Sequence, residues 1–169
     1  SASVHQVIER CQKNGTRIVA GGPLFTGNPE KYPQINHMVL NEAEITLPMF
    51  LHDLKMHRPK KIYKTERYAD MKHTPPPDYS LIDAKKYAQL SLQYSRGCPY
   101  NCEFCEITTL LGRKFRTKST WQILMELEKI YATGFRGNVF FVDDNFIGNK
   151  KKLKTDLLPA VFRWNKSHA

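Results

Sequence analysis

Three cysteines, Cys98, Cys102 and Cys105, stand at the spacing CxxxCxxC. Cysteine thiolates bind iron-sulfur clusters and structural zinc ions, and such sites are usually closed by four ligands. Three cysteines close three positions and leave one metal with an open corner, where a substrate or cofactor can bind. The spacing therefore favours an iron-sulfur cluster that takes part in catalysis over a purely structural metal site.

Two other uses of these cysteines need to be weighed. A zinc site that adds Cys11 or a histidine is an alternative, although zinc motifs usually contain two CxxC pairs and no second pair is present. Disulfides are disfavoured, because the gaps between neighbouring cysteines are short and residues 1–5 do not resemble a secretory signal. The sequence therefore predicts a reducing, cytoplasmic compartment, and Cys11 is interpreted as an ordinary helix residue.

The run from Ser95 to Cys105 resembles the cluster-binding loop of the radical S-adenosylmethionine (SAM) superfamily. The resemblance implies that Cys98, Cys102 and Cys105 hold a 4Fe-4S cluster whose fourth iron binds SAM. It also implies reductive cleavage of SAM to a 5'-deoxyadenosyl radical, with a flavodoxin or ferredoxin as electron donor. Phe104 matches the aromatic residue that packs near the adenine of SAM, and a core aromatic that shields the cluster from water is its alternative role.

The elements around the cysteine loop are predicted from local patterns. Residues 90–95 alternate like a strand and lead into the loop. After the loop, Ser119 and Gln122 form the capping box of a helix that ends at Gly134. Residues 138–143 then read as a buried strand. The cysteines thus follow the first strand of a strand-loop-helix-strand unit, which is the active-site end in α/β barrels.

Two adjacent carboxylates, Asp143 and Asp144, follow the second of these strands. At this place the superfamily has a Gly-Gly-Glu type of segment that receives the methionyl amine of SAM, whereas Asp-Asp-x-Phe is common in cobalamin-dependent relatives. We predict that the two carboxylates bind that ammonium group. The alternative is that they cap the following helix, a use to which Asp is well suited. The basic loop 112–118 either guides anionic groups or is solvated.

The N-terminal part of the chain has a different pattern. Residues 3–14 have apolar side chains at helical spacing, and residues 17–20 form a strand-like run. A second short apolar run at 37–40 precedes a helix through residues 47–54. Helix, strand, loop, strand and helix in this order predict the second half of a parallel α/β sheet.

This half resembles the C-terminal part of a Rossmann-like cobalamin-binding domain. Gly21 and Gly22 match the Gly-Gly that lets the nucleotide tail of cobalamin lie against the sheet, and residues 41–44 resemble the usual Gly-Glu-x-Glu, with a departure at Asn41. A tight strand-to-loop turn is the alternative role of the two glycines. The Asp-x-His-x-x-Gly stretch of that family, whose histidine can ligate cobalt, is missing. We therefore expect no useful affinity of this chain alone for cobalamin.

The predicted fold class is α/β, divided into three segments. Residues 1–57 are predicted to be the C-terminal part of the cobalamin-binding domain, residues 58–89 a linker, and residues 90–169 the N-terminal part of a radical SAM barrel. A complete barrel needs about 250 residues, so we expect a fragment of a longer enzyme. An incomplete parallel sheet exposes an edge strand, which predicts self-association through strand pairing.

The net charge and the positions of the basic residues indicate which classes of partner the chain can bind. The net charge of +10 would suit a nucleic acid, but the basic runs fall in the linker and on a predicted solvated helix face at 150–154, so no nucleic-acid partner is expected. No apolar run is long enough to cross a membrane. The resemblance as a whole is to cobalamin-binding radical enzymes that include hopanoid methylases, which implies methyl transfer to a small-molecule or lipid substrate. The alternatives are an RNA-modifying methylthiotransferase and a non-catalytic zinc or iron-sulfur module.

Overall fold

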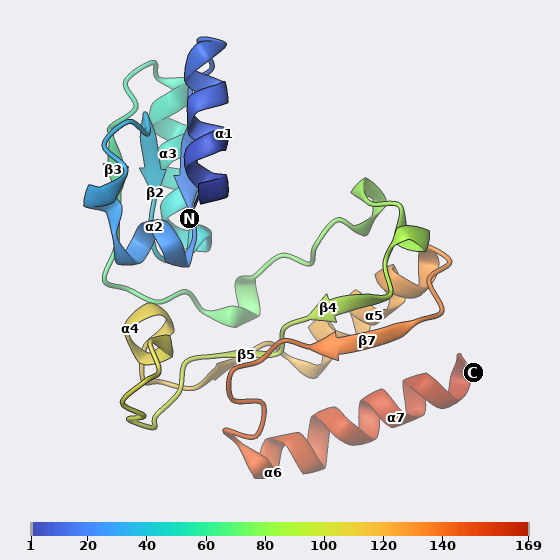
Figure 1. The fold of residues 1–169 in the computed structure, drawn as a ribbon. Helices are drawn as coiled ribbons and strands as arrows, with labels where there is room; N and C mark the ends of the chain where they lie inside the picture. Colours follow the sequence, from blue (N-terminus) through green and yellow to red (C-terminus); the bar gives the residue numbers. More distant parts are fainter. Residues whose placement is uncertain (1, 169) are drawn as a thin grey trace. The chain divides into compact units, whose positions relative to one another are not determined.

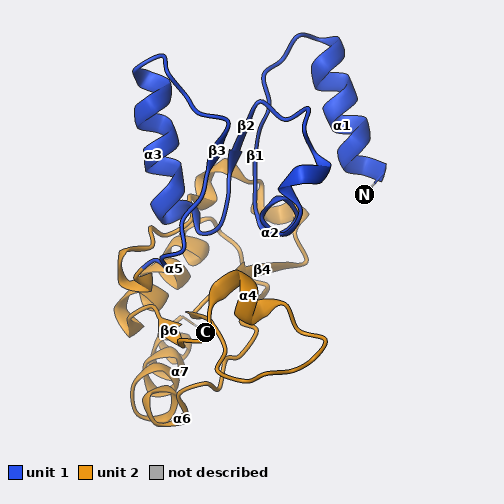
Figure 2. Ribbon diagram, turned by 90° about the vertical axis from the view of Figure 1, so that its left-hand side faces the viewer, with its two compact units in different colours: residues 1–69 blue, residues 70–169 orange. Residues whose placement is uncertain are grey.

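The chain divides into two compact units, residues 1–69 and residues 70–169 (Figure 2). The structure is a computed structural model that describes residues 2–168. The division falls inside the segment 58–89 that the sequence predicts as a linker, and the three-part domain assignment itself stays a prediction. Among the described residues, no helix is long and apolar enough to span a membrane.

Unit 1 is built on a parallel sheet with the strand order β1-β2-β3 (Figure 1). Its strands are β1 (Val19–Gly21), β2 (His37–Val39) and β3 (Ile62–Tyr63). Its helices are α1 (Ala2–Lys13), α2 (Pro23–Gly27) and α3 (Ala43–Lys55), with a 3-10 turn at Pro29–Lys31. The predicted succession of helix, strand, strand and helix in a parallel half sheet is thus confirmed.

Two small cores lie on opposite faces of this sheet. Ile8 of α1 packs in one cluster with Met38, whereas Phe50 of α3 packs in the other with Val39 and Tyr63. Met38 and Val39 are neighbours on β2, so their side chains point to opposite faces. Helices α1 and α3 therefore cover the two faces of the sheet, as Figure 2 shows.

Strand β3 was not expected from the sequence, because it lies within the segment 58–89. The backbone N–H of Met38 donates to the carbonyl oxygen of Lys61 at 2.7 Å, which adds β3 to the sheet. Tyr63 is buried, and its hydroxyl donates to the Asp53 carboxylate at 2.9 Å. A strand of two residues flanked by lysines has no detectable period, and its pairing with β2 forms only in the folded unit.

Unit 2 contains a parallel pair of strands, β4 and β7, and an antiparallel pair, β5 and β6. The strands are β4 (Gln89–Leu92), β5 (Ser95–Arg96), β6 (Arg116–Thr117) and β7 (Asn138–Phe141). The helices are α4 (Ile107–Leu111), α5 (Thr120–Ala132), α6 (Lys150–Lys152), a π-helical turn (Leu153–Leu157) and α7 (Leu158–Ser167). Because α5 connects the parallel strands β4 and β7, unit 2 contains one βαβ crossover.

The core of unit 2 lies on one face of the β4–β7 pair. Leu92 of β4 is buried with Ile123 and Leu127 of α5 and with Leu157, and Phe141 of β7 packs against the same cluster. Helices α5 and α7 also pack against each other. The helix start predicted from the capping box is confirmed, since both capping-box hydrogen bonds of α5 are present.

The prediction that the second strand is buried was wrong. Phe140 is 55% exposed and Val142 is 42% exposed. The physical reason is that β7 pairs with β4 alone among the described strands, and the helical layer covers only the face that carries Val139 and Phe141. The opposite face of the strand pair exposes Phe140 of β7 together with the polar Gln89 and Ser91 of β4.

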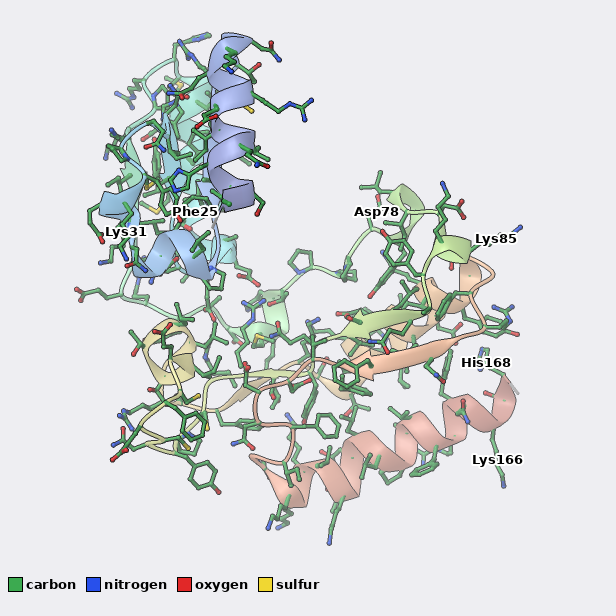
Figure 3. The ribbon with its side chains drawn as sticks, in the orientation of Figure 1. Phe25, Lys31, Asp78, Lys85, Lys166 and His168 are labelled. Atoms are coloured by element: carbon green, nitrogen blue, oxygen red, sulfur yellow. The ribbon has the colours of Figure 1, made fainter. Side chains whose placement is uncertain are left out.

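The segment between β3 and β4 contains three 3-10 turns. These turns are Met71–His73, Tyr79–Leu81 and Ala84–Lys86. Each is preceded by an aspartate whose carboxylate accepts a backbone N–H two residues on; for example, Asp78, labelled in Figure 3, accepts from Ser80 at 3.1 Å. Tyr79 and Met71 are buried, so this segment packs within unit 2, and it leads directly into β4.

Candidate functional site

The cysteine loop, residues 97–115, is closed at its base by the short β5–β6 pair. Ser95 pairs with Thr117, and Arg96 pairs with Arg116. The first residue of the loop is Gly97, whose φ of 82° lies in the region that favours glycine. A Cβ atom at this position would also clash with the carbonyl oxygen of Lys114.

The first cysteine is fixed by this closed base. The backbone N–H of Cys98 donates to the carbonyl oxygen of Gly112 at 3.1 Å. Farther out, the N–H of Cys105 donates to the carbonyl oxygen of Cys102 at 3.1 Å, which forms a turn between the second and third cysteines. The base of the loop is therefore held by the backbone of both its legs, and the other two cysteines lie toward its tip.

The chemistry of the donor set fits an iron-sulfur cluster. Cys98, Cys102 and Cys105 are free thiols on one loop; Cys102 is exposed and the other two are half-buried. Among the described residues, no three His, Cys, Asp or Glu side chains lie close enough together to hold a metal ion. The three thiols are thus available but not drawn together, and their role as cluster ligands stays a prediction. Cys11 lies on α1 of unit 1.

Phe104 lies at the tip of the loop and is 92% exposed. An aromatic side chain with this exposure makes little contact with the protein core. In this structure Phe104 therefore does not fill the alternative role of a core aromatic, and its place beside the adenine of SAM stays a prediction.

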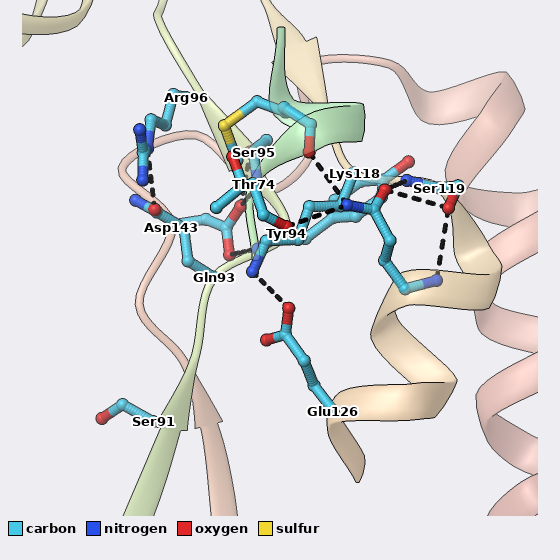
Figure 4. A network of polar contacts seen from close by, with 12 residues as sticks. Thr74, Ser91, Gln93, Tyr94, Ser95, Arg96, Lys118, Ser119, Glu126 and Asp143 are labelled. Atoms are coloured by element: carbon cyan, nitrogen blue, oxygen red, sulfur yellow. Dashed lines mark hydrogen bonds and ion pairs between the residues drawn. The ribbon is translucent and has the colours of Figure 1, made fainter. Parts of the chain in front are cut away.

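Asp143 ties the end of β7 to the start of the cysteine loop (Figure 4). Its carboxylate accepts the backbone N–H of Tyr94 at 3.1 Å, the backbone N–H of Ser95, and the hydroxyl of Ser95 at 2.5 Å. Hydrogen bonds to an ionised group each contribute about 1.5 to 3 kcal/mol. Asp143 therefore fixes the residues that lead into β5, whatever else it binds.

Asp144, the next residue, is in a different environment. It is exposed, and the structure records no hydrogen bond or ion pair for its carboxylate within residues 2–168. Neither aspartate caps a helix, because the N-cap of α6 is Asn149, whose side-chain oxygen accepts the N–H of Lys152 at 3.0 Å. The capping alternative therefore does not describe Asp143 or Asp144 in this structure.

The other leg of the loop is anchored by a buried ion pair. Lys118 follows β6, and its Nζ lies 2.6 Å from Oε1 of Glu126 on α5, with the two side chains only 4% and 1% exposed. The backbone N–H of Lys118 donates to the carbonyl oxygen of Tyr94 at 2.8 Å. Figure 4 shows this pair beside the Asp143 contacts. Lysine is rarely buried, and this lysine is buried because it is paired with a carboxylate.

This ion pair was not predicted from the sequence, and the expectation that Lys118 belongs to a basic loop that is either solvated or guides anions was wrong, because Lys118 is buried. The two partners lie eight residues apart, one after β6 and the other on α5, so no helical or strand period relates them. One signal was available: Glu126 lies between Ile123, Leu127 and Ile130 on the apolar face of α5. A carboxylate on such a face requires a buried partner.

In unit 1, Gly21 and Gly22 form a turn in which a larger residue would clash or be strained. A Cβ atom at Gly21 would lie 2.5 Å from the carbonyl oxygen of Val39, and Gly22 has a φ of 89°. The strands β1 and β2 thus approach too closely at this point for any side chain on Gly21. This geometry accounts for the turn by itself, and the predicted contact of the glycines with cobalamin is untested.

The segment that resembles Gly-Glu-x-Glu is also part of the fold. Asn41 has a φ of 64°, in the region that glycine favours, and its N–H donates to the hydroxyl of Thr26 at 3.0 Å. Glu42 is 5% exposed, and its Oε2 accepts the N–H of Ala69 at 2.5 Å. The left-handed backbone at Asn41 explains why glycine is usual here and why asparagine can replace it.

Comparisons with known proteins identify similar chains. An uncharacterized methyltransferase of Synechocystis sp. is 40% identical over 163 residues, which cover 95% of this chain and 30% of that protein. The hopanoid C-2 methylase of Rhodopseudomonas palustris is 37% identical over 167 residues, which cover 96% of this chain and 32% of that protein. No model of a protein family matches the sequence.

A solved structure has a similar fold. The cobalamin-dependent S-adenosylmethionine radical enzyme OxsB, with aqua-cobalamin and S-adenosylmethionine bound, superposes with a TM-score of 0.72 at 20% identity. The superposition covers 95% of this chain and 26% of OxsB. The chain is thus homologous to a segment of the methyltransferases named above, about a third of their length, and has the fold of part of a cobalamin-dependent radical SAM enzyme. The resemblance stated from the sequence and the predicted α/β fold class are both confirmed.

Proposed function

We propose that this chain forms part of a cobalamin-dependent radical SAM methyltransferase. In this proposal residues 1–57 end a cobalamin-binding domain, residues 58–89 connect it, and residues 90–169 begin a radical SAM barrel. The observation that carries the proposal is the cysteine loop, which follows β4 of a βαβ unit and combines a fixed base with three free thiols. The similarity to methyltransferases over 95% of the chain supports it.

Cys98, Cys102 and Cys105 would hold the cluster. When bound, a 4Fe-4S cluster supplies the electron that cleaves SAM, and its fourth iron is left to bind that cofactor. The protein's own part is to hold the loop: Gly97 allows the tight entry, and the N–H of Cys98 is anchored on Gly112. The exposed tip can then fold its remaining cysteines onto the cluster.

SAM would bind at the rim formed by the cysteine loop and the end of β7. We propose that Asp144 receives the ammonium group of SAM directly, since its carboxylate is exposed. Asp143 would add negative charge while it holds Tyr94 and Ser95 in place. Phe104, which is also exposed, would pack near the adenine.

Gly21 and Gly22 would lie against the nucleotide tail of cobalamin in the whole enzyme. The bare backbone at Gly22 supports the proposal, because a Cβ atom there would meet nothing within 4 Å and a ligand can approach without meeting a side chain. For this chain alone we predict no useful affinity for cobalamin. Equilibrium dialysis checks this, and tight binding by the isolated chain would contradict it.

The proposed reaction of the whole enzyme is methyl transfer to a small-molecule or lipid substrate. We also propose that a flavodoxin or ferredoxin donates the electron and that the enzyme is cytoplasmic. The open edge of the sheet would allow self-association. The free cysteines agree with a reducing compartment. The methylthiotransferase alternative is not favoured, since the two relatives described above are a methyltransferase and a methylase.

Anaerobic reconstitution with iron and sulfide tests the proposal. We expect a brown protein with iron and sulfide in cluster stoichiometry, and we expect Ser in place of Cys98, Cys102 or Cys105 to abolish uptake. Cys11→Ser is the matched control, because Cys11 lies on a helix of unit 1, and it should retain the cluster. Stoichiometric zinc without iron uptake would instead establish the zinc-module alternative.

A further inference from the structure

A residue outside the sequence motif contacts the first cysteine. The side-chain amide of Asn145 donates from Nδ2 to Sγ of Cys98 at 3.6 Å, across 47 residues of sequence. A sulfur acceptor lies farther from its donor than oxygen does, because the sulfur atom is larger. Asn145 is half-buried, so solvent competes only in part for this amide.

Hydrogen bonds of Ser95 fix the backbone on the Asp143 side of Asn145. The hydroxyl of Ser95 donates to the Asp143 carboxylate at 2.5 Å and lies 3.5 Å from the carbonyl oxygen of Asn145. Ser95 belongs to β5, which opens the cysteine loop. Ser95 therefore joins β5 to the segment that carries Asn145 through two contacts, one with Asp143 and one with Asn145 itself. Both contacts lie close in sequence to the amide of Asn145 and the thiol of Cys98.

The contact is also held from the other side of Asn145. The ring of Phe146 packs against Tyr94, with ring centroids 5.9 Å apart, and against Phe141 at 4.9 Å. Tyr94 is buried in the core of unit 2. Asn145 is thus fixed between the hydrogen bonds of Ser95 and the aromatic contacts of Phe146, and Cys98 is itself fixed at the closed base of the loop.

The chemistry of this pair is directional. A thiolate that ligates iron has no proton and can only accept, so the amide must present its N–H to it. Such a hydrogen bond withdraws electron density from the sulfur and stabilises the more negative, reduced form of a cluster. Hydrogen bonds to ligand sulfurs are among the features that set cluster reduction potentials.

We propose that Asn145 is a positioning residue that hydrogen-bonds the Cys98 ligand and raises the reduction potential of the cluster. This inference rests on the proposed function, since it requires that Cys98 ligates a cluster. It assigns to Asn145 a task separate from that of the two preceding aspartates: they act on the loop backbone and on SAM, whereas Asn145 acts on a ligand atom.

The test compares two asparagines of the same chain. Asn145→Leu keeps the approximate shape of the side chain and removes its donor. Asn138→Leu is the matched control, because Asn138 is exposed at the start of β7. Both variants and the parent chain are reconstituted anaerobically, their iron and sulfide contents are measured, and their reduced clusters are titrated electrochemically with detection by electron paramagnetic resonance.

We expect Asn145→Leu to retain the cluster and to lower the ratio of reduced to oxidised cluster at a fixed potential about threefold to tenfold, tenfold being 59 mV for one electron. Asn138→Leu should match the parent. An unchanged potential in Asn145→Leu with full iron content, or an equal shift in Asn138→Leu, would overturn the inference alone. If the parent chain takes up no iron, the proposed function fails first, and the iron analysis shows this before any potential is measured.

Discussion

The glycine turn of unit 1 and the cysteine loop of unit 2 both follow a parallel strand, but they are held in different ways. The turn is set by the backbones of two adjacent strands, which meet where Gly21 faces the carbonyl oxygen of Val39. The cysteine loop is closed by the backbone pairing of β5 with β6 and is anchored in addition by side chains from distant parts of the sequence. Asp143 holds its first leg, and the pair of Lys118 and Glu126 holds its second.

This difference agrees with two kinds of ligand site. A turn made by backbone alone offers a smooth surface, suited to a ligand that lies against it. In a loop that is anchored at its base and exposed at its tip, Cys98 is fixed while the two outer cysteines can still move onto a metal. Substitutions of the side-chain anchors should therefore affect the cysteine loop and not the glycine turn.

Removal of one partner of the buried ion pair should have the largest effect. Lys118→Met leaves the carboxylate of Glu126 buried without a counter-charge, and we expect about 3 to 5 kcal/mol lower stability in urea unfolding. Lys86→Met is the control, because Lys86 and Asp83 form an exposed pair with side chains 79% and 54% accessible, and it should change stability by less than about 1 kcal/mol.

The double variant sharpens this prediction. Lys118→Met combined with Glu126→Leu removes both charges and should restore most of the stability that Lys118→Met loses, because no unpaired charge remains. If Lys118→Met alone is as stable as the parent chain, the buried pair does not hold the second leg of the loop.

Substitution of Asp143 should lower stability, whereas substitution of Asp144 should weaken SAM binding. Asp143→Asn keeps one acceptor oxygen but loses the ionised partner of Tyr94 and Ser95, and we expect about 1.5 to 3 kcal/mol lower stability. Asp144→Asn in the full-length protein should weaken SAM binding about tenfold, equivalent to 1.4 kcal/mol, with cluster content and melting temperature nearly unchanged.

Calorimetric unfolding and SAM binding titrations on both variants check this separation. If Asp144→Asn loses the fold while SAM affinity is intact in the soluble fraction, Asp144 is a structural residue and the proposed binding role is wrong. If Asp143→Asn is fully stable, the carboxylate does not anchor the first leg of the loop.

The glycines of the two regions can be compared by the same substitution. Gly97→Ala forces an L-residue into a left-handed conformation and should lower the free energy of unfolding by about 1 to 3 kcal/mol. Gly21→Ala overpacks the approach of β1 to β2 and should cost about 1 to 3 kcal/mol. Gly27→Ala, where a Cβ would meet nothing within 4 Å, should be neutral or up to about 1 kcal/mol more stable.

Urea unfolding measures all three glycine variants. Gly97→Ala should also lower iron uptake, because it distorts the closed base beside Cys98, whereas Gly21→Ala should leave iron uptake unchanged. Equal iron uptake by these two variants would show that the base of the loop does not prepare the cluster site.

The smallest expected effect is a dependence of stability on high pH. Burial, with a further contribution from the charge of Glu126, raises the pKa of Tyr79 from 10.0 to about 12. The folded state therefore retains the phenolic proton where the unfolded chain has lost it, and this stability is fully present below pH 10 and lost as the pH rises toward 12.

Urea midpoints measured from pH 9 upward check this dependence. Tyr79→Phe should weaken the pH dependence, because it removes the titrating hydroxyl from the buried site. Tyr100→Phe is the control, since Tyr100 is 65% exposed, and it should leave the dependence as in the parent chain. A Tyr79→Phe profile identical to that of the parent would contradict the assignment.

Local signals in the sequence predicted the local structure well. The capping box of Ser119 and Gln122 marked the start of α5, and Gly134 follows its end with a φ of 82°. The position of the cysteine loop after a strand was also predictable, because alternation of side chains is a property of adjacent residues. These features depend on residues within a few positions of each other.

The anchors of the loop could not be predicted in this way. The contact of Asn145 with Cys98 joins residues 47 positions apart, and the burial of Lys118 requires the packed face of α5. The exposure of Phe140 depends on which faces of the strand pair are covered. Of these three features, only the buried pair has a trace in the sequence, which is the position of Glu126 on the apolar face of α5. The other two are consequences of tertiary packing alone.

In the proposed site, three cysteines hold a cluster and leave one iron open for SAM. Electron paramagnetic resonance of the reduced, reconstituted chain, recorded with and without SAM, tests this arrangement. We predict a cluster signal whose g-values change when SAM is added, since a new ligand then binds the open iron. A signal that SAM leaves unchanged, or a chain that binds zinc and no iron, would contradict this arrangement.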